Sequence, residues 1–103
     1  VTHSERTSAE TRRGPHQLFG IQTWIALPEQ HEEMAPAFEH HPAAALPVIE
    51  AEGAVARLIL GTAYGAASPV TMLSETFYID AQLQPGAAMP LPDPRGIRAC
   101  PVR

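Results

Sequence analysis

The chain has 103 residues, of which 45% are hydrophobic and 17% charged, so one small folded domain fits its length and disorder is not expected. Its net charge is −4 and its seven basic residues are all arginine, which argues against direct binding to nucleic acid. No apolar run approaches the ~20 residues of a membrane span and no signal peptide is visible, while the single cysteine favours a cytoplasmic protein.

The first segment, residues 1–14, is polar and predicts a loop. Within it His3 and Glu5 are two positions apart, so an extended backbone projects both side chains from the same face. An imidazole beside a carboxylate forms half of many iron, nickel, manganese or zinc sites. The same residues also fit a helix capping box that starts at Thr2. The spacing alone therefore leaves a metal site and a capped turn as alternatives.

The stretch Phe19–Pro28 predicts the central strand of the fold. Its side chains alternate between two faces, with Ile21, Thr23, Ile25 and Leu27 on one face and Gln22, Trp24 and Ala26 on the other. It is rich in β-branched and aromatic residues and stops at a proline. We expect this strand to be paired on both sides in a complete barrel.

Residues 28–35 predict one short helix, because a proline begins the segment, glutamates follow in its first turn and Pro36 ends it. Three histidines in and after this segment suggest a second metal hypothesis together with Glu32. Their spacing matches no established ligand signature, and a solvated loop explains them better. These histidines are His31, His40 and His41.

The second half of the chain predicts further short strands separated by turns. The eleven prolines and seven glycines suit such strands better than long helices. The fold class is therefore all-β, as a barrel or sandwich. The strands are expected at 46–50, 54–60, 76–84 and 87–91, with turns at Gly53 and Pro85-Gly86, a loop over 61–69 and an irregular tail over 93–103.

Several motifs occur in the order used by the pirin family, which the chain resembles from about residue 1 to 92. They are His3-Ser-Glu-Arg, Gly20-Ile-Gln-Thr-Trp-Ile-Ala-Leu-Pro28, Glu33-x-x-Pro36-x-Phe38-x-His40-His41, Leu46-Pro47, Gly61-x-x-x-Gly65-x-x-Ser68-Pro69-Val70, Phe77-Tyr78-x-Asp80 and Pro85-Gly86-Ala87. Each piece is weak alone, but their ordered combination is specific. The tail departs from the family, which would continue with a strand of the type Glu-Arg-Ala-x-Tyr-Val-Val-Glu-Gly.

The resemblance implies two stacked cupin β-barrels, of which the first holds one divalent metal, usually Fe(II), through three histidines and a glutamate. His3 and Glu5 match the family's His-x-Glu ligand motif, whereas the chain contains no His-x-His motif for the other two ligands. Residues 1–60 would then be the C-terminal part of the first cupin, and residues 61–92 the connection and opening strands of the second. The chain resembles the middle of a pirin.

For function, the resemblance leaves three alternatives. The full-length protein is a quercetin 2,3-dioxygenase-type enzyme acting on a small aromatic, flavonol-like substrate, with Glu5 as metal ligand and catalytic base. Alternatively, it is a non-enzymatic, iron-dependent regulatory protein with a protein partner, or the chain is an inactive fragment. If the chain folds alone, we expect an incomplete, open sheet and an exposed Trp24.

Overall fold

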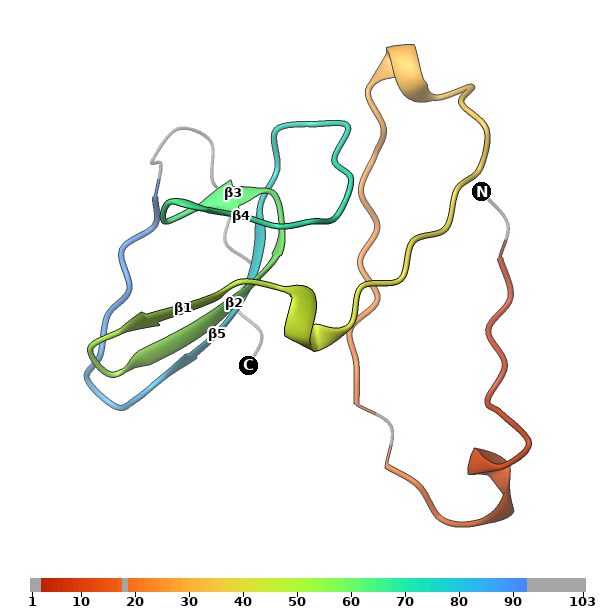
Figure 1. The fold of residues 1–103 in the computed structure, drawn as a ribbon, viewed down its shortest axis with the longest axis horizontal. Coiled ribbons are helices and arrows are strands. Elements are labelled where there is room, and N and C mark those ends of the chain that lie inside the picture. Colours follow the sequence, from red (N-terminus) through yellow and green to blue (C-terminus); the bar gives the residue numbers. More distant parts are fainter. Residues whose placement is uncertain (1–2, 18, 93–103) are drawn as a thin grey trace. The chain divides into compact units, whose positions relative to one another are not determined.

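The computed structural model describes residues 3–17 and 19–92, so the tail expected over 93–103 lies outside the described residues. The chain divides into two compact units, residues 1–37 and 38–103. The described part of the first unit holds two single 3₁₀ turns, and the second holds one such turn and the strands (Figure 1). The elements are η1 (Thr11–Arg13), η2 (Glu29–His31), η3 (Ala43–Ala45), β1 (Val48–Ala51), β2 (Ala54–Leu60), β3 (Thr62–Ala63), β4 (Ala66–Ala67) and β5 (Tyr78–Leu83).

The central strand expected over residues 19–27 does not form in this chain, and that prediction was wrong. The segment lacks strand pairing and is exposed along its length, with Trp24 at 74% and Phe19 at 99% exposure. A strand is stabilised by ladder hydrogen bonds to a neighbour, and the described part of the first unit supplies no second strand. The expected exposure of Trp24 is confirmed.

The short helix expected over 28–35 is only the single turn η2, followed by a hydrogen-bonded turn to Met34. The amide of Met34 donates to the carbonyl of His31 at 3.2 Å. Helices of this length are marginal without tertiary packing, and η2 has no buried residue to provide it.

The three-stranded antiparallel sheet β1-β2-β5 forms the centre of the second unit (Figure 1). Its middle strand β2 alternates in burial, with Ala54, Ala56 and Leu58 buried and Val55 and Arg57 exposed. In register, Leu58 lies opposite Ile79, so this apolar face continues onto β5. Leu58 is the only large side chain among the described residues that is fully buried. The mainly-β class and the open sheet are thus confirmed, and the core is small.

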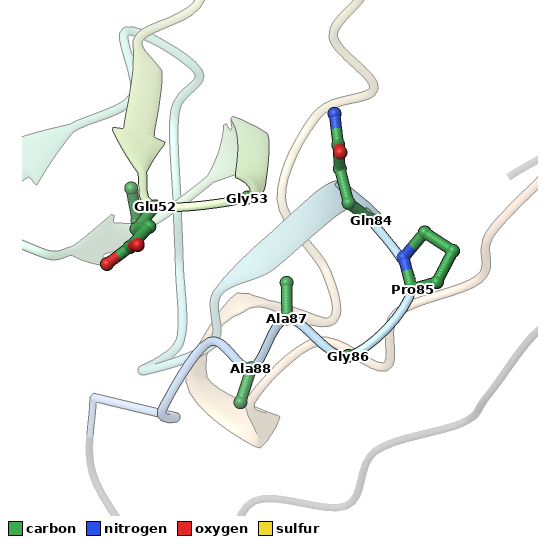
Figure 2. A pocket seen from close by; sticks show the side chains of 8 residues that line it. Glu52, Gly53, Gln84, Pro85, Gly86, Ala87 and Ala88 are labelled. Carbon is green, nitrogen blue, oxygen red and sulfur yellow. The ribbon is translucent and has the colours of Figure 1, made fainter.

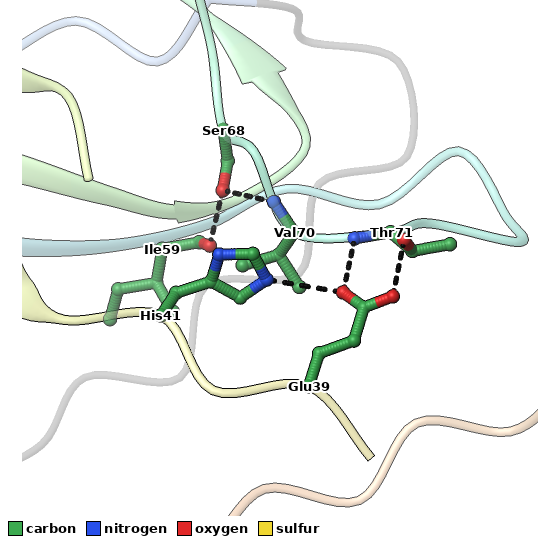
Figure 3. A network of polar contacts seen from close by, with 6 residues as sticks. All are labelled: Glu39, His41, Ile59, Ser68, Val70 and Thr71. Atoms are coloured by element: carbon green, nitrogen blue, oxygen red, sulfur yellow. Dashed lines mark hydrogen bonds and ion pairs between the residues drawn. The ribbon is translucent and has the colours of Figure 1, made fainter. Parts of the chain in front are cut away.

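A β-bulge interrupts the pairing of β2 with β5, because Leu58 pairs with Ile79 while Leu60 pairs with Tyr78. The extra residue, Ile59, has no opposite partner in the register. Its carbonyl instead accepts a hydrogen bond of 2.7 Å from the Ser68 hydroxyl (Figure 3). Ser68 therefore satisfies a partly buried backbone group that the bulge would otherwise leave unpaired.

The segment expected as a loop over 61–69 contains a small hairpin, β3 paired with β4. Tyr64 and Gly65 connect the two strands with φ angles of +52° and +75°. Positive φ at both central residues is typical of a type I′ turn, whose twist matches that of the flanking strands. The Tyr64 hydroxyl donates to the carbonyl of Pro90 at 2.7 Å, which anchors a residue that rarely adopts this conformation.

The turns at Gly53 and Pro85-Gly86 are confirmed, but residues 87–91 form no strand. The strands β2 and β5 fall on either side of the boundary expected at residue 60 and pair in one sheet. The division into cupin pieces 1–60 and 61–92 stays a prediction. Within the described residues, no helix has the length and apolar character needed to cross a membrane.

Candidate metal centre

The two residues predicted as metal ligands lie together in the first unit. His3 Nε2 is 3.7 Å from Glu5 Oε1, and their side chains are 49% and 78% exposed. Residues 3–5 form no helix or strand, and both side chains reach a common point, as the i, i+2 spacing predicts. The pair is therefore open to solvent and available to an ion.

A third polar group, the Gln22 amide, lies at this pair and was missed by the sequence interpretation. Its Nε2 donates to Glu5 Oε1 at 3.2 Å and lies 3.4 Å from His3 Nε2. The signal was present in the sequence, because Gln22 and Trp24 share one face of the alternating segment. Within the first unit, the pair His3 and Glu5 therefore faces the pair Gln22 and Trp24.

Trp24 completes this arrangement on the side of His3. The ring centroids of Trp24 and His3 are 6.2 Å apart and their planes are inclined by 47°. This is within the range of tilted aromatic contacts. The only tryptophan of the chain is therefore a direct reporter of what happens at His3.

The donor set fits half of a metal site. Two ligand atoms about 2.1 Å from one ion are roughly 3.0–3.4 Å apart at octahedral or tetrahedral angles. The separation of 3.7 Å between His3 Nε2 and Glu5 Oε1 is close to this. Over residues 3–17 and 19–92, no three His, Cys, Asp or Glu side chains gather in a cluster able to hold an ion. Imidazole with carboxylate suits divalent iron, zinc and manganese alike.

The histidines of the second hypothesis do not form a metal cluster. His41 instead joins a hydrogen-bonded group in the second unit, where its Nε2 is 3.1 Å from Glu39 Oε2 (Figure 3). Thr71 donates to the same carboxylate twice, from its hydroxyl at 2.6 Å and from its amide at 3.3 Å. The hydrogen bond from the Thr71 hydroxyl, followed by that from His41, lowers the pKa of Glu39 to about 2.

A shallow hollow of about 480 Å³ lies between two adjacent turns of the second unit, Glu52-Gly53 and Gln84–Ala88 (Figure 2). The amide of Gln84 donates to the carbonyl of Gly53 at 2.8 Å, and a Cβ at Gly53 would lie 2.8 Å from that of Ala87. Small side chains and backbone form most of its lining. This is the packing of two turns, and its only ionisable side chain is Glu52.

The fold and the site show a mainly-β protein with an exposed His-x-Glu pair. Comparisons with known proteins identify its family. The chain is 44% identical over 93 residues to a pirin-like protein of Caulobacter vibrioides, covering 89% of this chain and 32% of that protein. It is 30% identical over 96 residues to human pirin, covering 93% of the chain and 31% of that protein. A Pseudomonas aeruginosa protein, provisionally named a quercetin 2,3-dioxygenase, is 32% identical over 74 residues, which are 72% of this chain and 22% of that protein.

The chain belongs to the pirin family, as its ordered motifs predicted. It spans about a third of the length of the Caulobacter and human relatives. No family model matches the chain, and no solved structure matches it.

Proposed function

We propose that this chain carries half of the metal centre of a pirin-type cupin protein, with His3 and Glu5 as two of the four ligands. The convergence of His3 Nε2 and Glu5 Oε1 at 3.7 Å carries the proposal, together with the family membership. The favoured metal is Fe(II), which the pirin resemblance implies and which an imidazole–carboxylate pair accommodates.

The favoured activity of the whole protein is dioxygenation of a small aromatic, flavonol-like substrate. The provisional name of the Pseudomonas relative supports this substrate class. When bound, iron supplies Lewis-acid and redox chemistry. The proposed role of the Glu5 carboxylate is to accept the proton of a substrate hydroxyl, and its 78% exposure beside His3 supports this role.

Calorimetry with Fe(II) or Ni(II) tests the metal site on this chain. Two protein ligands leave at least two positions to water, so we expect weak binding that His3→Ala removes. Submicromolar affinity that His3→Ala abolishes would contradict the proposal that half the ligands are missing. In a version that also carries the His-x-His motif, Glu5→Gln should keep the fold and lose most of the iron. Retained iron and activity would show that Glu5 is the wrong ligand.

A second candidate is a non-enzymatic, iron-dependent regulatory protein that binds a protein partner. The net charge of −4 favours protein partners over nucleic acid. Oxygen uptake with quercetin by the full-length protein, with and without iron, separates the two candidates. A cytoplasmic location stays a prediction, as does the alternative that the chain alone is inactive.

A further inference from the structure

The hydrogen bonds of Gln22 meet the same two atoms that the proposed metal site uses. One amide nitrogen donates to Glu5 Oε1 at 3.2 Å and lies 3.4 Å from His3 Nε2. In the neutral imidazole with its proton on Nδ1, the Nε2 lone pair accepts this hydrogen bond. That lone pair and the carboxylate oxygen are the groups that would bind a cation. The Gln22 N–H group therefore occupies the place of an ion between them.

The other end of the same amide is an oxygen donor. A half-turn about the last side-chain torsion exchanges the N–H group for the carbonyl oxygen, which is a ligand for hard and borderline divalent ions. Gln22 is exposed, so no packing opposes this turn. Its position is set by the extended segment that also carries Trp24, whose ring contacts His3.

We propose that Gln22 is the third member of the metal site. In the metal-free chain its amide N–H holds Glu5 and His3 near each other, and with metal bound its carbonyl oxygen faces the ion. This inference rests on the proposed function, because it assigns a role at the same site. It changes the donor set of the chain from one nitrogen and one oxygen to one nitrogen and two oxygens.

Titration with Co(II), followed by fluorescence of the single Trp24, tests this role without an activity assay. Gln22→Met keeps the side-chain length and removes both the N–H donors and the carbonyl oxygen of the amide, so it should weaken Co(II) binding by about 10-fold. Gln22→Glu places an anionic oxygen at the same position and should tighten binding. A merely structural role for Gln22 predicts weaker binding in both variants.

Gln17 provides the matched control, because it is an exposed glutamine of the same unit. Gln17→Met should bind as the wild type does, and Gln17→Glu measures the effect of one added negative charge alone. The inference would be overturned if Gln22→Glu bound Co(II) no more tightly than Gln17→Glu does. It would also be overturned if Gln22→Met bound Co(II) with the affinity of the wild type. His3→Ala and Glu5→Gln test the underlying site separately. If they bind as the wild type does, the proposed function fails, whereas their weakening beside an unchanged Gln22→Met refutes only the role of Gln22.

Discussion

Residues 19–27 and 54–60 have the same kind of sequence but reach different structures. Both are short, largely apolar runs that contain β-branched side chains and predict a strand, although 19–27 alternates whereas 54–60 is apolar at every position except Arg57. The segment 54–60 becomes β2, paired with β1 and β5, whereas 19–27 remains unpaired and exposed. The difference lies in the neighbours. A strand pattern specifies which face can be buried, but ladder partners and a covering surface decide whether a strand forms.

Truncating one apolar residue in each segment should show this difference most clearly. Leu58→Ala removes the only large fully buried side chain of the described residues and should lower the free energy of unfolding by about 2–5 kcal/mol. Ile25→Ala, at a residue 42% exposed, should change it by less than about 0.5 kcal/mol. Urea unfolding followed by far-UV circular dichroism measures both. Equal losses would mean that residues 19–27 are packed after all.

Two glycines with similar backbone angles distinguish strain from packing within the second unit. Gly61 and Gly65 have φ angles of +76° and +75°. Alanine at Gly65 meets no atom within 4 Å, so it should cost only the left-handed strain of about 1–2 kcal/mol. At Gly61 the new Cβ would clash with the Thr76 carbonyl and lie 3.0 Å from Phe77 Cα, so Gly61→Ala should cost more. Equal shifts in thermal midpoint would refute the close approach at Gly61.

Acid should weaken the second unit through Glu39. Its pKa is about 2 in the folded chain, below the ordinary 4.5, because Thr71 and His41 hydrogen-bond to its carboxylate. Folding therefore favours the ionised form, and this stabilisation is complete above about pH 4.5 and lost as the pH falls toward 2. Thermal midpoints measured over this range should fall less in Glu39→Gln than in the wild type. Glu75→Gln, at an exposed glutamate, is the control. If the thermal midpoint of Glu39→Gln falls with pH as steeply as that of the wild type, the effect is excluded.

The exposed apolar side chains of residues 19–27 should make the chain self-associate. At about tens of micromolar, sedimentation should detect species larger than a monomer, and Trp24 in the dilute chain should emit at the wavelength of a water-exposed indole. A monomer with cooperative unfolding and blue-shifted Trp24 emission would show instead that the chain closes its own core.

Local patterns in the sequence predicted what local physics decides. The strand at 54–60, the turn at Gly53 and the facing of His3 and Glu5 all follow from spacing and residue type. The local pattern of 19–27 could not show that it lacks a partner, because strand pairing is not local, and only the family resemblance predicted an open sheet and an exposed Trp24. The Tyr64-Gly65 turn was missed because tyrosine seldom adopts positive φ, and Gln22 was missed because its hydrogen-bond partners lie seventeen and nineteen positions away.

Amide hydrogen exchange, resolved by residue, tests the central claim most directly. It should be measured below the concentration at which sedimentation detects self-association. We expect slow exchange for the paired amides of β2 and exchange near the unstructured rate throughout residues 19–27. Protection of residues 19–27 equal to that of residues 54–60 would contradict the account, because it would require a strand partner for that segment.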